Sequence, residues 1–148
     1  MMPVEGLFST TINVLGQSID LRTRNQNLIS ANIANAETPG YTPKKLEFEQ
    51  QLQSAVKKSS ARGMGAVAAG STTHPAHIPL RGGSAERINQ VKGVVVETPS
   101  KTPGRDGNSV EMENEMSSMM QNQVMFNASV QLLSKKFEGL RSALREGK

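Results

Sequence analysis

The last part of the chain carries a long heptad pattern of apolar residues. The pattern advances by alternating steps of three and four residues through Met112, Met116, Met119, Gln123, Phe126, Val130, Leu133, Phe137, Leu140 and Leu144. Gln123 is the one polar member of this series. A seam sustained over so many repeats is typical of a helix that packs in a coiled coil. We therefore predict a C-terminal heptad helix over 109–148, with Asn108 or Ser109 as its N-cap.

The start of the chain carries a second helical pattern, which is broader. One apolar row consists of Phe8, Ile12, Leu15, Ile19, Ile29 and Ile33, and it is interrupted by Arg22 and Gln26. A neighbouring row consists of Val4, Leu7, Val14, Leu21 and Leu28. Together the rows make a stripe wider than a two-helix seam needs. We predict an amphipathic N-terminal helix over 1–36 that contacts more than one neighbour.

The middle of the chain shows little periodicity. Thr38-Pro39-Gly40 should end the first helix, because proline disfavours helix in the residue before it and glycine supplies a turn. We predict a signature turn and a short extended or helical segment over 37–58, then a flexible segment rich in Gly, Pro and Ser over 59–108. Within the latter, the valines at 94–96 are sufficient for one short β element, and a flexible linker or a β element ordered by a neighbour both remain open.

The expected fold class is therefore all-α. Long N- and C-terminal helices pack as an α-helical coiled coil in a helical assembly, around a largely irregular middle with that short β element. Composition agrees, because the apolar fraction of 36% is below the roughly 45–50% usual in globular domains. Aromatic residues make up only 3% and Trp is absent, so few large side chains can fill a core.

Charge and targeting signals narrow the class of partner. The net charge of +4 is concentrated in residues 41–104, where Tyr41 and Phe48 are the two aromatic residues and arginines form no run, so we expect no nucleic-acid partner. Cys is absent, which excludes disulfides and thiol chemistry. We also expect no cleaved signal peptide and no membrane-spanning segment, since no apolar run has the required length.

No residue pattern predicts an active site. His74 and His77 are the two histidines, but zinc normally takes three or four protein ligands, so we interpret them as loop residues. Glu111, Glu113 and Glu115 do not share one helix face, and a charged helix start accounts for them. We expect no enzyme activity, no cofactor, no metal and no small-molecule substrate.

Residues 30–41 have the most distinctive local pattern. Small residues at 31, 34 and 36 allow close approach of a neighbouring helix, and Asn32 and Asn35 lie on one face. Buried there, the two amides would fix register as a buried Asn does in a coiled coil. The alternative, that both are surface residues near a helix end, remains open.

This segment, SANIANAETPGY, resembles the N-terminal signature of flagellar rod, hook and hook-filament proteins. Residues 44–49 (KKLEFE) and 106–116 (DGNSVEMENEM) are similar to the proximal members of the flagellar basal-body rod family. The length also agrees, because hook and distal-rod members usually carry large additional domains. The resemblance thus covers both ends of the chain.

The resemblance implies a structural subunit of the rod, located in the basal body where the rod crosses the periplasm. Such proteins are exported unfolded by the flagellar type III system, and their terminal helices are often disordered until they pair in the assembly. Implied partners are copies of the chain, other rod subunits, a rod-base adaptor and export-gate components. The implied work is torque transmission between the rod base and the rest of the rod. The alternatives are a neighbouring proximal rod protein or a cytosolic coiled-coil regulator or chaperone.

We expect the assembly interface to combine the signature with the two apolar series. Its candidate residues are Leu15, Ile19, Ile29, Asn32, Ile33, Asn35, Pro39, Gly40, Tyr41, Met119, Phe126, Val130, Leu133, Phe137, Leu140 and Leu144.

Overall fold

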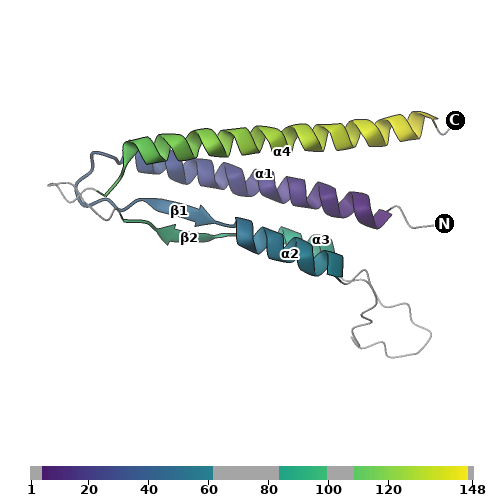
Figure 1. Ribbon diagram of the computed structural model, residues 1–148, viewed down its shortest axis with the longest axis horizontal. Helices are drawn as coiled ribbons and strands as arrows, with labels where there is room; N and C mark the ends of the chain where they lie inside the picture. The colour runs from purple at the N-terminus through teal and green to yellow at the C-terminus, as the bar shows by residue number, and fades with distance from the viewer. Residues whose placement is uncertain (1–4, 62–83, 100–108, 147–148) are drawn as a thin grey trace, which may run out of the picture.

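A computed structural model describes residues 5–61, 84–99 and 109–146. The elements, in chain order, are α1 (Glu5–Ala34), β1 (Lys44–Glu47), α2 (Glu49–Ala61), α3 (Ser84–Asn89), β2 (Val94–Glu97) and α4 (Met112–Glu146). They form an elongated molecule in three layers, with α1 between α4 and a layer that contains the strands and the two short helices (Figure 1).

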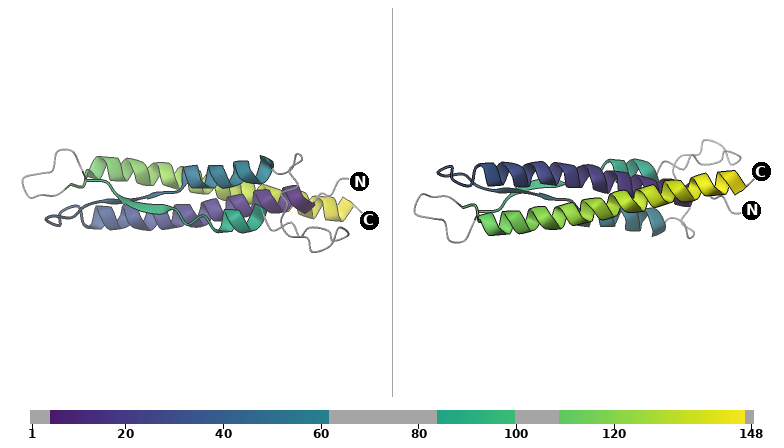
Figure 2. Two further views of the ribbon diagram at one scale, coloured as in Figure 1. Left: turned by 90° about the horizontal axis from the view of Figure 1, so that it is seen from below. Right: turned by 90° about the horizontal axis from the view of Figure 1, so that it is seen from above.

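The two long helices lie side by side and antiparallel. Figure 2 shows them together in both views, with the start of α1 and the end of α4 at the same end of the molecule. With 30 and 35 residues, they extend for roughly 45 and 53 Å. The prediction of a mainly helical fold, built on packed N- and C-terminal helices, is confirmed.

The two strands form a small antiparallel sheet. Its register pairs Lys44 with Glu97 and Glu47 with Val94, and the pairing continues where the Thr98 amide donates to the Pro43 carbonyl over 2.9 Å. The expected short β element at 94–96 is therefore present, and its partner is β1 from the other side of α2. The predicted segment 59–108 also contains α3, while its residues 62–83 and 100–108 lie outside the described part of the chain.

The apolar core lies between α1 and the β layer. It consists of Leu21, Leu46, Phe48 and Val91, with Leu28, Leu52 and Ala55 packed against it. Gly93 permits this close packing. Its φ of +68° is in the left-handed region, and a Cβ there would lie 3.0 Å from Leu46 Cδ1. None of the described residues of α4 belongs to this cluster.

The start of α4 differs from the prediction. The Glu111 carbonyl accepts a hydrogen bond from the Glu115 amide at 3.0 Å, so Glu111 stands at the N-cap position and the helix begins at Met112. Ser109 is therefore not the cap. Its hydroxyl donates instead to the Tyr41 carbonyl over 3.1 Å, which ties the approach to α4 to the turn after α1. Asn108, the other predicted cap, lies outside the described residues.

Candidate assembly surface

The Thr38–Tyr41 segment forms a tight turn. The Tyr41 amide donates to the Thr38 carbonyl over 3.2 Å, and Gly40 has a φ of +72°. Proline at the second position and a left-handed glycine at the third are the requirements of a type II turn. The sequence Thr-Pro-Gly-Tyr therefore reverses the chain after α1 and leads it back along the helix as β1.

Asn32 is the hub of this end of the molecule. Its side chain is 1% exposed, and its Oδ1 accepts from the Lys44 amide (2.9 Å) and the Tyr41 hydroxyl (3.1 Å). Its Nδ2 donates to the Lys44 carbonyl (2.8 Å) and to Glu115 Oε2 (3.0 Å). One buried amide thus connects α1, the turn, β1 and α4, and its hydrogen-bonding capacity is satisfied.

Asn35, the second signature asparagine, has a local role. Its Nδ2 donates to the Ala31 carbonyl over 2.8 Å, and its Oδ1 accepts from the Thr38 hydroxyl over 3.3 Å. It is half-buried at the end of α1. The two asparagines therefore differ, because Asn32 joins three segments whereas Asn35 satisfies groups at its own helix end.

Polar residues recur along the α1–α4 interface at seven-residue intervals. On α1 they are Ser18, Asn25 and Asn32, and facing them on α4 are Ser129, Asn122 and Glu115. Asn25 donates to Asn122 Oδ1 at 3.4 Å, and the two serine Oγ atoms lie 3.5 Å apart. The interface is therefore a ladder of polar layers with apolar residues between them.

Asn122 is the most buried α4 member of this ladder, at 4% exposure. Its Nδ2 donates to the Arg22 carbonyl and to Gln26 Oε1, both over 2.9 Å. Arg22 and Gln26 are the residues that interrupt the apolar series of α1 in the sequence. The interruption therefore marks the place where α1 receives the buried amide of α4.

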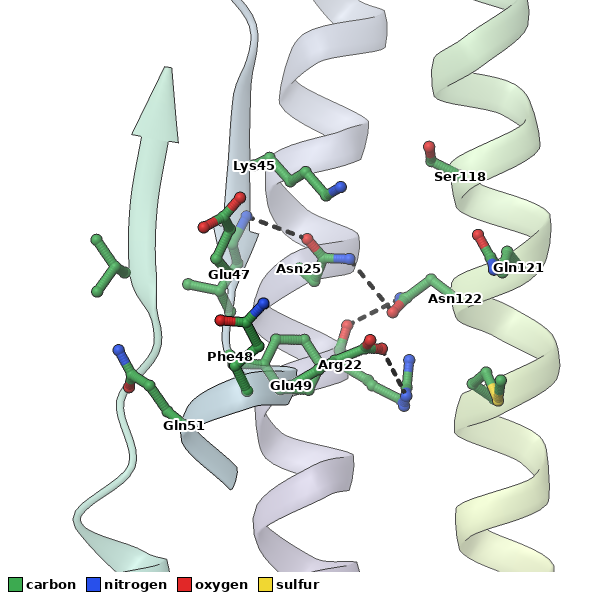
Figure 3. Close-up of a pocket in the computed structure, with 14 residues that line it drawn as sticks. Arg22, Asn25, Lys45, Glu47, Phe48, Glu49, Gln51, Ser118, Gln121 and Asn122 are labelled. Carbon is green, nitrogen blue, oxygen red and sulfur yellow. Dashed lines mark hydrogen bonds and ion pairs between the residues drawn. The ribbon is translucent and has the colours of Figure 1, made fainter. Parts of the chain in front are cut away.

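A groove of about 490 Å³ separates α4 from the β1–α2 corner (Figure 3). Arg22 lies in it, with its guanidinium 5.5 Å from the centre of the Phe48 ring and 3.3 Å from Glu49 Oε1. The groove is lined by a mixture of charged, amide and apolar side chains. Within 5–61, 84–99 and 109–146, no three His, Asp or Glu side chains could hold a metal. The two histidines at 74 and 77 lie outside these ranges.

The heptad series of α4 is divided between two environments. Met119, Phe126, Leu133 and Leu140 are half-buried beside α1. Met112, which shares the spacing of these four residues, is 38% exposed. The alternate positions form what we call the outer stripe, which consists of Met116, Gln123, Val130, Phe137 and Leu144. Its apolar members are exposed by 53%, 37%, 52% and 80%, respectively. Half of the predicted seam therefore has no partner within the part of the chain that the structure describes.

α1 has three differently used sides. One carries the polar ladder toward α4, and another carries Leu21 and Leu28 into the core. Ile12, Gly16 and Ile19, spaced by four and three residues, lie on the third side. A Cβ added at Gly16 would meet no atom within 4 Å, which agrees with an open surface there.

The sequence of the whole chain identifies its family. The family described as "Flagella basal body rod protein" matches residues 20–42. The flagellar basal body rod protein FlgB of Cereibacter sphaeroides is 31% identical over 138 residues, which are 93% of this chain and 96% of that protein. FlgB of Yersinia ruckeri is 29% identical over 131 residues, or 88% and 90% of the two chains, and FlgB of Escherichia coli K12 is 28% identical over the same length and shares.

The chain belongs to the flagellar basal-body rod protein family. The resemblance seen at residues 30–41 is thereby confirmed. As a member of the rod family, the chain is a structural protein of the flagellar basal body and not an enzyme. No helix in the described ranges is long and apolar enough to span a membrane.

The matched segment of this rod protein, 20–42, coincides with the connections described above. It contains Arg22, Asn25, Asn32 and the Thr38–Tyr41 turn. These residues connect α1 to β1 and to α4. The family signature in this chain is therefore mainly the set of residues that holds one end of the subunit together.

The candidate interface residues of the rod protein fall into three groups. Ile29 and Asn32 are buried within the subunit. The half-buried group consists of Leu15, Ile19, Ile33, Asn35, Tyr41, Met119, Phe126, Leu133 and Leu140. The exposed group consists of Pro39, Gly40, Val130, Phe137 and Leu144. The exposed candidates are therefore concentrated at the turn and on the outer stripe.

The sequence analysis missed the polar ladder. Ser18, Asn25, Asn122 and Ser129 were not singled out, and Glu115 was interpreted as part of a charged helix start. The signal was available, because each set of polar residues repeats at intervals of seven within a heptad pattern. A search for polar heptad positions, next to the search for apolar ones, would have found them.

Proposed function

We propose that this chain is a proximal subunit of the flagellar rod and that it assembles with copies of itself and with other rod subunits through its terminal helices. The observation that carries the proposal is the outer stripe of α4. Four large apolar side chains stand there at heptad spacing and remain exposed after α1 and α4 have paired. A stripe of this spacing fits a further helix.

The third side of α1 supports the same proposal. Ile12 and Ile19 lie there as half-buried residues, with Gly16 between them facing open space. Small residues allow helices to approach closely, and isoleucine provides apolar area. A neighbouring helix that contacts both this side of α1 and the outer stripe of α4 would cover apolar residues of both helices.

The same proposal covers the position of the chain in the rod and its individual partners. The similarity of residues 44–49 and 106–116 to proximal members supports a place near the rod base. There the chain would contact a rod-base adaptor and export-gate components as well as rod subunits. It would reach this place through the flagellar type III system, lie in the periplasmic part of the structure and transmit torque.

The test replaces the chromosomal copy with variants that carry one new aspartate on α4. Phe137→Asp places a charge in the outer stripe without touching the α1 interface, and Gln131→Asp is the control at another exposed position of α4. We expect Phe137→Asp to abolish incorporation into purified basal bodies and motility in soft agar, because burying an unpaired charge is strongly unfavourable. Gln131→Asp should leave both unchanged.

Leu133→Asp provides a second comparison, since Leu133 faces α1 and this variant should fail by disrupting the subunit itself. Export of each variant is measured separately, so that failed secretion is not mistaken for failed assembly. A motile Phe137→Asp strain with normal amounts of the chain in its basal bodies would contradict the proposal.

A further inference from the structure

The two-stranded sheet of β1 and β2 and the helix α4 are both held by α1, but they share no core. The apolar cluster contains residues of α1, β1, α2 and the loop before β2. The groove lies between the β1–α2 corner and α4, where Phe48 and Met125 line opposite walls. The side chains that hydrogen-bond to both α4 and β1 come from α1.

Two side chains of α1 touch both partners. Asn32 holds the backbone of Lys44 through its amide oxygen and nitrogen and also donates to Glu115. Asn25 accepts from the Leu46 amide through Oδ1 at 3.4 Å and donates to Asn122 through Nδ2 at 3.4 Å. Each planar amide thus has a bond to β1 and a bond to α4 (Figure 3 shows both bonds of Asn25).

The positions of these bonds on β1 follow from the sheet register. The bond between Thr98 and Pro43 places residues 43, 45 and 47 as the pairs that bond across to β2. The backbones of Lys44 and Leu46 therefore point to the outer edge of the strand, where Asn32 and Asn25 receive them. The two asparagines close the edge of β1 that an isolated two-stranded sheet would leave open.

We infer that seating of α4 on α1 in one register positions the two-stranded β1–β2 sheet, with Asn25 and Asn32 as the positioning residues that transmit the effect. With α4 in place, Asn122 and Glu115 fix the rotation of the two amides, and each amide then presents the correct atoms to β1. A shift of α4 by one heptad separates Glu115 from Asn32, Asn122 from Asn25 and Ser129 from Ser18, so the observed pairs are lost. The two-stranded sheet is therefore fully held only when the two ends of the chain have paired in this register.

The absence of Cys in the chain permits a direct test. Ser18 Oγ and Ser129 Oγ lie 3.5 Å apart, so the double variant Ser18→Cys/Ser129→Cys should form a disulfide in this register and not in one shifted by a heptad. We call its oxidised form the clamped chain. The clamp touches only the two helices, and it gives an intramolecularly paired state even where free ends would separate.

Amide hydrogen exchange at Lys44 and Leu46 is the readout. Oxidation of the clamp should slow exchange at both amides by on the order of tenfold or more. Asn122→Ala in the clamped chain should remove most of the added protection at Leu46. Gln123→Ala is the matched control, because Gln123 is exposed and its amide donates only within α4, to Asn127.

Each possible result either supports or overturns the inference. Slower exchange on clamping, lost with Asn122→Ala and kept with Gln123→Ala, supports the inference. Equal exchange in the reduced and clamped chains overturns it, as does equal Leu46 exchange in the Asn122→Ala and Gln123→Ala chains. Failure of the disulfide to form overturns it too, because the polar ladder would then not set the register. Rod incorporation does not enter the test, so its result is independent of the proposed function.

Discussion

The two occupied sides of α1 are built in different ways. Toward the two-stranded sheet, Leu21 contacts a continuous apolar cluster that includes Leu46 and Phe48. Toward α4, polar layers such as Asn25 with Asn122 alternate with apolar residues. The side of α1 toward the sheet buries large apolar side chains against one another. The side toward α4 consists of hydrogen-bonded polar layers with apolar residues between them.

The difference assigns separate tasks to the two sides. Burial of apolar surface is the main source of stability and is largely indifferent to register. A buried polar pair contributes little net free energy, but a mismatch leaves unsatisfied groups and is expensive. The side of α1 toward the sheet therefore supplies stability, and the side toward α4 supplies register while leaving the outer stripe of α4 available.

The largest expected effect comes from Phe48→Ala, which removes a ring from the apolar side. Phe48 is 4% exposed and lies in the core, so the free energy of unfolding should fall by about 3–5 kcal/mol. Phe137→Ala is the control with the same chemical change on the outer stripe, and it should alter stability by less than about 1 kcal/mol. Urea unfolding of the clamped chain measures both, and equal losses would contradict the division between the two regions.

The next effect separates the two signature asparagines. Asn32→Ala leaves the Lys44 backbone and Glu115 without their partner, and we expect the clamped chain to lose about 2–3 kcal/mol. Asn35→Ala removes local bonds at a helix end and should lose less than about 1 kcal/mol. The same urea titration compares them. Similar values for the two variants would show that Asn32 is not a hub.

These two asparagines also show how far sequence reasoning reached. The helices, their pairing and the short β element followed from periodicity, because an apolar stripe and a run of valines are local signals. The special role of Asn32 did not follow, since both asparagines precede the same turn in the same kind of sequence. What separates them is the path of β1, which returns past Asn32 and not past Asn35.

The division of the α4 seam was hidden from the sequence for a similar reason. Heptad spacing shows which residues share a stripe, but not how the helix is rotated about its axis. The rotation is set by Asn122 and Ser129, which face α1 and turn Val130 and Phe137 outward. An apolar pattern alone therefore predicted one interface where the subunit has an inner half and an outer half.

A smaller effect tests the close packing of the apolar side. Gly93→Ala adds a Cβ at a left-handed φ and 3.0 Å from Leu46 Cδ1, so we expect a loss of about 2 kcal/mol. Gly40→Ala has the same kind of φ with no atom within 4 Å, and it should lose only about 1 kcal/mol. The difference between their unfolding free energies isolates the steric contact. No difference would mean that the core yields to an extra methyl group.

The smallest expected change in stability concerns Gly16 on the third side of α1, which extends the comparison beyond the two occupied sides. Gly16 lies within the helix, and a Cβ there meets nothing within 4 Å, so Gly16→Ala should stabilise the clamped chain by about 0.5–1 kcal/mol. The gain arises from helix propensity, because no atom of the described residues lies within 4 Å of the added Cβ. If another subunit packs closely at this glycine, the same variant should enter basal bodies less efficiently despite its greater stability. A variant that is more stable and also assembles normally would restrict the assembly surface to the outer stripe of α4.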